Sequence, residues 1–228
     1  MALDKTFKVR HNTIAPVAEG MADQAVVNRM GFQVVTDFFT QMILSGRAYH
    51  VQVGTEDAGV ETAAALDDQL AFMICDNSAG NCMMPLLYEA TPGVIAAATL
   101  IQAALTVDKD IVRYASGGTA YVPANLRGDD RNAASGTFYV QSDDVIPAAQ
   151  SASPNCIELA RQDFIEDTIT TSLGYPGAWN TVIYSIRKRP ACAIIDAGSI
   201  VCQLGAATDQ PLSYGVLEFA QFPKALVV

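Results

Sequence analysis

Charge is scarce in this sequence: 17% of its 228 residues are Asp, Glu, Lys or Arg, against about 25% in an average globular domain. Basic residues are the scarcer sign, because 14 Lys and Arg stand against 24 Asp and Glu, for a net charge of −10. Nucleic-acid binding relies on clustered Lys and Arg, so this balance argues against direct contact with a nucleic acid. Half of the residues are apolar. A surface so poor in charge predicts apolar contact area, and hence an oligomer.

Groups that carry catalysis are scarce as well. The chain has two histidines, His11 and His50, and neither lies near a candidate nucleophile in the sequence. A Ser-His-Asp or Cys-His arrangement would need one of them. No set of Cys, His and carboxylate residues has the spacing of a zinc site, and there is no EF-hand spacing. We therefore expect a non-enzymatic protein that uses no cofactor and no metal.

Acidic pairs leave two alternatives open. Loop carboxylates could hold Ca²⁺ together with backbone carbonyls, although solvated loop charge is the favoured interpretation. Two carboxylates on separate strands could hydrolyse a glycosidic bond, but the single Trp gives little support for a sugar cleft. The Arg-Gly-Asp tripeptide at residues 127–129 is interpreted as turn chemistry rather than as an integrin ligand. The acidic pairs are Asp67-Asp68, Asp129-Asp130, Asp143-Asp144 and Asp108-x-Asp110.

Cysteine pairing and membrane insertion also find little support. The five cysteines make an odd count without a C-x-x-C pair. A bridge between Cys75 and Cys82 could form across an expected turn, but reduced thiols in a protein made in a cytoplasm are the favoured interpretation. Residues 1–16 lack the apolar core of a signal peptide. The longest apolar run, residues 94–105, is shorter than the ~20 residues that span a bilayer, so we expect no membrane partner.

The last fifty residues carry the clearest structural pattern. Four short apolar segments, residues 179–187, 191–195, 199–205 and 212–222, are separated by turn residues. In the third, Ile200, Cys202 and Leu204 fall on one face, which we expect to be buried, and Ser199 and Gln203 on the other, which we expect to be wet. Short strands with frequent turn signals predict an all-β fold. The interpretation is an antiparallel double-sheet sandwich of jelly-roll type with long loops.

Further segments complete this prediction: an extended N-terminal arm over residues 1–30 precedes a single domain over residues 31–228. Ser45-Gly46 is expected to join residues 32–44 and 47–53 as a hairpin. A central strand at 70–75 is expected to pair with residues 83–90, in which Pro85 suggests an edge. The remaining assignments are a strand at 94–106, preferred over a helix; a strand at 137–141 with Phe138 and Val140 inward; a strand or helix at 156–170; loops at 114–134 and 142–155; and a solvated strand end at 187–189.

Three stretches of sequence resemble those of the trimeric jelly-roll cement proteins that decorate the capsids of tailed bacteriophages. They are residues 86–89 leading into Pro92-Gly93, residues 117–123, and residues 194–201. The resemblance implies a structural virion protein made in the host cytoplasm and placed on the capsid exterior. It also implies a homotrimer that bridges neighbouring major capsid proteins and stabilises the shell. The alternative is a sugar- or receptor-binding jelly-roll domain of lectin-like or fibre-tip type, and a sandwich hydrolase is a further rival.

The resemblance also suggests where contacts would lie. Lys5, Lys8 and Arg10 on the arm would suit an acidic patch on the major capsid protein. Three aromatic residues on predicted strands could lie in the trimer seam, although placement in the core is the favoured alternative. These residues are Tyr184, Tyr214 and Phe219.

Overall fold

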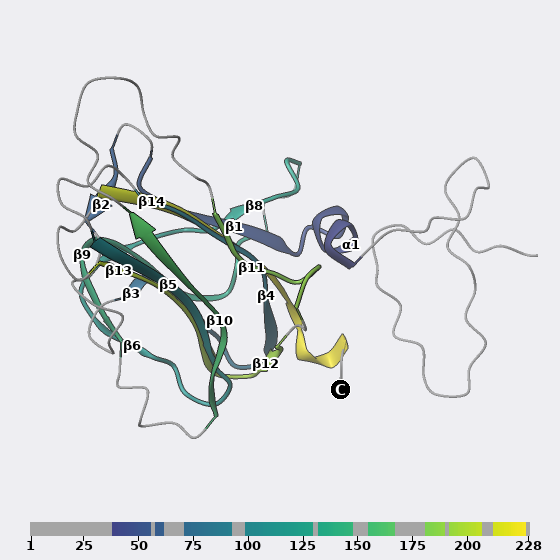
Figure 1. Cartoon of the computed structure of the whole chain (residues 1–228). Helices are drawn as coiled ribbons and strands as arrows, with labels where there is room; N and C mark the ends of the chain where they lie inside the picture. Colours follow the sequence, from purple (N-terminus) through teal and green to yellow (C-terminus); the bar gives the residue numbers. More distant parts are fainter. Residues whose placement is uncertain are drawn as a thin grey trace, which may run out of the picture.

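Nearly every described element in the computed structural model of this protein is a β-strand (Figure 1). In chain order the elements are α1 (Phe38–Leu44), β1 (Ala48–Val53), β2 (Val60–Glu61), β3 (Ala71–Asn77), β4 (Asn81–Thr91), β5 (Thr99–Asp108), β6 (Tyr114–Ser116), β7 (Thr119–Ala120), β8 (Ala124–Asn125), β9 (Gly136–Pro147), β10 (Cys156–Glu166), β11 (Thr181–Ser185), β12 (Ile194–Ile195), β13 (Gly198–Ala206), β14 (Leu212–Pro223) and the 3-10 helix η2 (Lys224–Leu226). The structure describes residues 38–55, 58–61, 71–92, 99–129, 132–147, 155–166, 181–189, 192–206 and 212–226. The expected arm at residues 1–30 lies outside this part.

The strands form two antiparallel sheets that pack face to face. The first sheet has the order β11-β4-β14-β1-β8, with β12 also on β4 and β2 on β14. The second has the order β10-β5-β13-β3-β9-β6, with β7 also on β9. The predicted all-β double-sheet sandwich is therefore confirmed. No helix in the described residues is long and apolar enough to cross a membrane.

Eight strands pair in a nested order. β1 pairs with β14, β3 with β13, β4 with β11, and β5 with β10, so the first of the eight meets the last and the middle two meet each other. Contacts of β14 with β4 and of β13 with β5 join these pairs into the two sheets. Most of the ladder therefore links residues that are far apart in the chain.

The core lies between the two sheets. Phe138 of the second sheet stacks on Phe219 of the first with 5.5 Å between ring centroids, and Tyr49 stacks on the same ring at 5.5 Å. The alternate apolar residues of β5 are also buried in this core. Phe138 and Val140 also point inward as predicted. The β5 residues concerned are Ile101, Ala103, Leu105 and Val107.

The expected wet face of β13 is wrong. Ile200, Cys202 and Leu204 face the core as predicted, but every residue of β13 is buried. The strand lies in the middle of its sheet, and further side chains cover its outer face: Val201 packs with Ala71 and Ile74, beneath two partly buried tyrosines, Tyr114 and Tyr139. A covered central strand is buried on two sides whatever the alternation of its sequence.

The expected hairpin at Ser45-Gly46 is also wrong, because residues 38–44 form helix α1. The amide of Gly46 donates to the carbonyl of Ile43, and that of Arg47 donates to the carbonyl of Met42, at 2.9 Å each. Gly46 has φ +67°. This is the Schellman pattern, in which a glycine in the left-handed conformation ends a helix. Ser45-Gly46 is thus a helix stop rather than a turn between strands.

β3 and β4 do not pair as expected, since they lie in opposite sheets. Cys75 belongs to the main core and Cys82 to a second cluster beneath α1, and none of the five cysteines forms a disulfide. β4 as a whole lies between β14 and β11, but at Pro85 it has a ladder partner on the β14 side alone, because β11 pairs only from Leu87 onward and β12 only at Cys82 and Met83. The edge that Pro85 predicts is therefore local, while the start of the strand is paired on both sides. Pro85 pairs with Phe219 at a register shift between Glu218 and Phe219, where a missing N–H is tolerated.

The remaining segments divide between confirmed and corrected predictions. The strand preferred for residues 94–106 is confirmed from Thr99 onward by β5, while residues 93–98 lie outside the described part. The open choice for residues 156–170 resolves as strand β10. The loop expected at 142–155 is wrong in its first half, because β9 continues to Pro147. The loop expected at 114–134 contains the short strands β6, β7 and β8.

Candidate functional site

The residues predicted to make contacts fall in different places. Lys5, Lys8 and Arg10 lie outside the described residues. Tyr184 and Phe219 are fully buried in the core of the protomer, the placement that the sequence favoured over a trimer seam. Tyr214 on β14 is partly exposed. It is therefore the member of this set that retains accessible surface.

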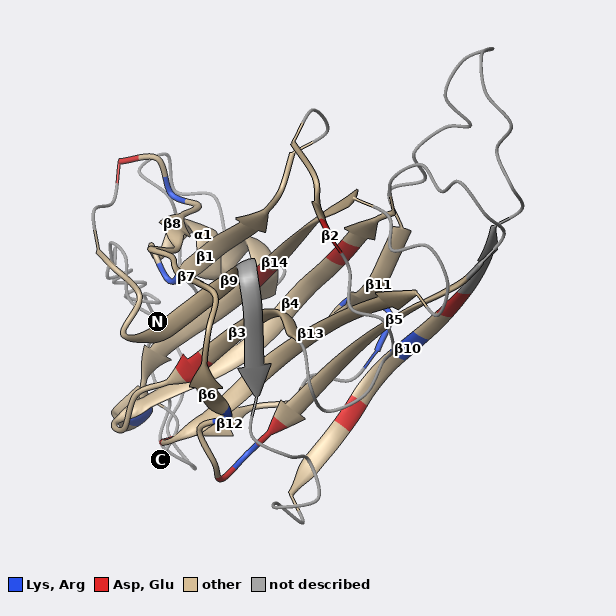
Figure 2. Cartoon of the chain, turned by 90° about the vertical axis from the view of Figure 1, so that its left-hand side faces the viewer, with Lys and Arg blue, Asp and Glu red and all other residues tan. Residues whose placement is uncertain are grey.

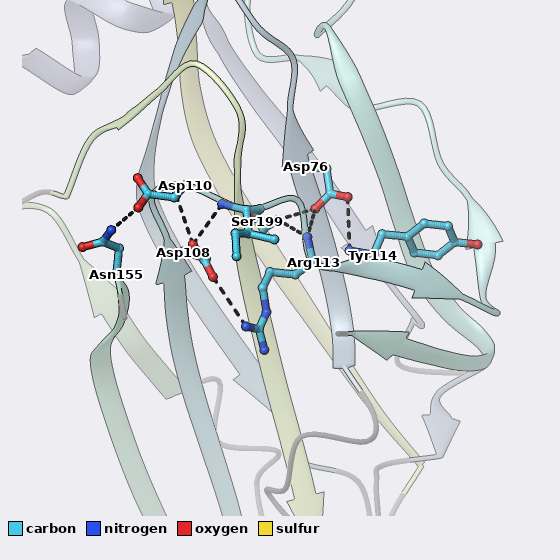
Figure 3. A network of polar contacts seen from close by, with 8 residues as sticks. Asp76, Asp108, Asp110, Arg113, Tyr114, Asn155 and Ser199 are labelled. Atoms are coloured by element: carbon cyan, nitrogen blue, oxygen red, sulfur yellow. Dashed lines mark hydrogen bonds and ion pairs between the residues drawn. The ribbon is translucent and has the colours of Figure 1, made fainter. Parts of the chain in front are cut away.

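Asp76 at the end of β3 organises a buried polar network (Figure 3). Its Oδ1 is 2.5 Å from the Ser199 hydroxyl, and its Oδ2 accepts the amide of Tyr114 at 3.2 Å. The amide of Arg113 donates to Ser199 Oγ at 2.6 Å. Burial raises the pKa of the Asp76 carboxyl, and these hydrogen bonds oppose that rise. The network ties the loop after β5 to the ends of β3 and β13.

Asp108 and Arg113 form a buried ion pair at the other side of the same loop. Arg113 Nη1 lies 3.4 Å from Asp108 Oδ2, and the side chains are 1% and 0% exposed. Asp108 Oδ1 also accepts the amides of Asp110 and Ile111 at 3.0 and 3.1 Å. Asp108 was expected to carry solvated loop charge, and its burial contradicts that interpretation. Asp110 reaches the Asn155 amide, which joins the loop to the start of β10 (Figure 3).

This network holds backbone in place and has no arrangement suited to nucleophilic catalysis. Ser199 is fully buried, and His50, the histidine in the described part, lies on β1 of the other sheet. The Ser199 hydroxyl lies beside Asp76 Oδ1 and 3.1 Å from the Ile111 carbonyl, and because it is fully buried a substrate has no access to it. Sequence reasoning did not find Arg113, because a single basic residue in a loop carries no signal of burial. We assign the network a structural role.

His50 faces the outer side of the first sheet and pairs across the strands with Glu218. Its Nδ1 lies 3.7 Å from Glu218 Oε1, and the two residues are register partners in β1 and β14. The hydrogen bond with Glu218 raises the pKa of His50, while partial burial lowers it by a smaller amount. His50 thus occupies a strand-surface position.

The Arg-Gly-Asp loop and the acidic pairs show no ligand-binding geometry in the residues that the structure describes. Arg127 holds Asp129 with two bonds, 2.6 and 3.0 Å, and donates to the Leu44 carbonyl at 3.1 Å. Both charges of the tripeptide are thus engaged with each other. Within the described ranges, no group of three or more His, Cys, Asp and Glu residues could hold a metal ion. Asp67-Asp68 and Asp130 lie outside those ranges.

The strongest candidate for interaction is an edge surface formed by β10 and β5 of the second sheet with β11 and β12 of the first. On these strands four large apolar side chains are each 36–40% exposed: Leu100, Ile157, Val182 and Ile195. Leu100 pairs with Ile165 near one end of the β10–β5 ladder and Ile157 with Val107 near the other, so these side chains are spread out rather than gathered in one patch. β10 alternates charge along its outer face, where Glu158 and Arg161 pair at 2.6 Å and Asp163 is exposed (Figure 2). The three basic residues 187–189 follow β11 and are exposed.

Residues 187–189, here called the basic turn, form the exposed strand end that was expected, and two of them are also held by contacts within the chain. The guanidinium of Arg187 lies 5.4 Å from the centroid of the Phe39 ring of α1. Arg189 Nη1 donates to the Leu159 carbonyl of β10 at 3.0 Å. The turn therefore links α1, β11 and β10 and holds its charges at the edge surface.

Comparison with known proteins adds no relative: no protein-family model matches the chain, and no curated protein matches it. Function must therefore be argued from the fold and the surfaces described above.

Proposed function

We propose that this chain is a capsid cement protein, a structural virion protein that decorates the exterior of a tailed-bacteriophage capsid. As a homotrimer it bridges neighbouring major capsid proteins and stabilises the shell. The observation that carries this proposal is the nested pairing of eight strands in two sheets. From that order we infer a jelly roll, an architecture that recurs in viral capsid domains.

The surface supports an assembly protein. Charged residues make up 17% of the chain, and the edge surface combines exposed apolar side chains with arginines, which protein interfaces favour. A protein that works by contact with copies of itself and with a shell would have such a surface.

The native mass tests this proposal directly. Purified chain should have the mass of a trimer in solution, and chain released from purified particles should be recovered in a fixed ratio to the major capsid protein. Mass spectrometry under native conditions gives the first number, and quantitative gel analysis of particles gives the second. A monomer that never co-purifies with particles would rule the proposal out.

The arm provides a second test. Deletion of residues 1–16, which removes Lys5, Lys8 and Arg10, should abolish attachment to particles, because these cations are expected to hold an acidic patch on the shell. The shortened chain should keep its circular dichroism spectrum and melting temperature. Attachment at the level of the full-length chain would show that the arm is not the anchor.

A sugar-binding jelly roll is the second candidate, and one observation favours it. Tyr114 and Tyr139 stack with ring centroids 3.8 Å apart and planes 3° apart on the outer face of the second sheet, where both are partly exposed. Exposed aromatic rings can pack against sugar rings. A glycan array probed with and without Ca²⁺ tests this candidate: selective binding that is lost in Tyr139→Ala would favour it over the cement protein.

A further inference from the structure

The edge surface presents opposite charges in adjacent places. The basic turn supplies three cations, and the outer face of β10 supplies Glu158 and Asp163, here called the acidic row, with Arg161 between them paired to Glu158. The two lie side by side, because Arg189 of the turn donates to the Leu159 carbonyl, next to Glu158. A surface that carries both signs can place the basic turn of one copy against the acidic row of another.

The charges on this surface are pre-positioned. Arg187 rests on the Phe39 ring, and Arg189 is bonded to β10. Lys188 between them is exposed, and its ammonium forms no ion pair with any described residue. On the acidic row, Asp163 accepts the Gln102 amide at 3.0 Å. Side chains held in advance lose less conformational entropy when they bind.

The surface is built for side-chain contact rather than for sheet extension. The register of β10 against β5 shifts between Glu158 and Ala160, and Arg189 occupies the Leu159 carbonyl at this bulge. Bulges and charged residues on an edge strand hinder pairing with another strand. A partner on this edge must therefore contact side chains.

We propose that the edge surface is the contact between copies of this chain, with the basic turn of one protomer facing the acidic row of the next. Ile157 of β10 and Val182 of β11, each more than a third exposed, add apolar surface on the two strands that carry these charges. Repetition of such a head-to-tail contact closes a ring when the rotation permits. The inference rests on the proposed function only in requiring that copies associate, and it names the surface by which they do so.

Electrostatics favours a second copy of this chain as the partner that binds the edge surface. Each chain carries a net charge of −10, so two copies repel unless unlike charges meet locally. Charges separated by more than about 8 Å are screened at physiological ionic strength, so the local charges decide the contact. The basic turn is a compact group of cations in an acidic chain, and an acidic neighbour of the same sequence complements it.

Charge reversal tests the contact. Lys188→Glu and Asp163→Lys should each weaken association about fivefold or more, because each puts like charges face to face. The double variant should regain association to within about threefold of the original chain, since it restores unlike charges with reversed sign. The measurement is the association constant from sedimentation equilibrium of the full-length chain at physiological salt. Arg127→Glu, the same charge change in the loop after β8, is the control and should behave like the original chain.

The outcomes separate this inference from the proposed function. If the original chain and all variants associate equally, copies meet elsewhere, and the charges on β10 serve only to protect the sheet edge. If Arg127→Glu weakens association as much as Lys188→Glu, net charge rather than this contact is responsible, and the inference is wrong. In either case association and attachment to particles persist, so the proposed function stands. A chain that stays monomeric at every concentration overturns both.

Discussion

At the scale of single residues, the fully buried pair of Arg113 and Asp108 is the most demanding arrangement in the described structure. A buried charge is costly unless a partner compensates it, so loss of one partner exposes the whole desolvation penalty of the other. Asp108 has compensation from two backbone amides as well as from Arg113. Arg113 Nε and Nη2 have no hydrogen-bond partner, which makes the arginine depend on Asp108 for its stabilisation.

Arg113→Met should lower the free energy of unfolding by about 3 kcal/mol, because Asp108 then remains buried without its cation. Urea unfolding followed by fluorescence gives this value. The double variant Arg113→Met with Asp108→Asn should recover part of the loss, since it removes the uncompensated charge. Arg127→Met, which disrupts an exposed pair, is the control and should change stability little. Equal losses in the single and double variants would contradict this account.

The His50–Glu218 pair should make stability depend on pH. Because the pKa of His50 is raised in the folded chain, the pair stabilises the fold fully below the unfolded pKa of about 6.5. This contribution is lost as the pH rises through the folded pKa, which lies above that value. The difference in melting temperature between the original chain and Glu218→Gln should therefore be larger at pH 5.5 than at pH 8.5. A difference that is constant or grows with pH would contradict the assignment.

At the scale of elements, the buried side of a strand could be predicted from the alternation of apolar and polar residues in its sequence. Which strands pair with each other could not be predicted in this way. The pattern of residues 137–141 places Phe138 and Val140 correctly because period two follows from strand geometry alone. The adjacency of β3 and β4 in the chain suggested a pair, but their turn carries the chain from one sheet to the other. The edge surface was missed because β10 and β11 are brought together only by the nested fold.

The end of helix α1 shows that one dipeptide can fit two different local structures. Ser-Gly suits a hairpin turn as well as a helix stop, and only the buried side of residues 38–44 decides between them. Met42 is fully buried against Ala48 and Leu86 on the first sheet, so packing favours the helix. Tertiary contacts of this kind override local propensity.

Gly46→Ala should destabilise the fold by about 1 kcal/mol, because a residue with a Cβ is strained at φ +67°. The melting temperature measured by circular dichroism checks this. Gly128→Ala is a matched control: a Cβ at Gly128 meets nothing within 4 Å, and its backbone lies outside the left-handed region. Equal shifts of the melting temperature in both variants would show that the left-handed backbone at Gly46 does not account for the loss of stability.

At the scale of the whole molecule, nested pairing makes the two ends of the described chain interdependent. β1 near the start and β14 near the end are register partners over six residues, from Ala48 with Ala220 to Val53 with Gly215. β14 also pairs with β4 along its other side, so it holds the middle of the first sheet together. Few of these contacts are local in sequence, and folds of this kind form slowly and as a unit.

A chain that stops at residue 206 should therefore fail to fold, although it retains most of the strands. Loss of β14 separates β1 and β8 from β4, β11 and β12 and uncovers core residues such as Phe138 and Tyr49, which stack on Phe219. The expected result is loss of the cooperative thermal transition, with exposed apolar surface reported by dye binding. Deletion of residues 1–37 is the comparison, because it removes no described strand and should leave one sharp transition. If the chain ending at residue 206 still unfolds cooperatively, the two sheets are independent of the nested pairing, and the inference of a jelly roll loses its basis.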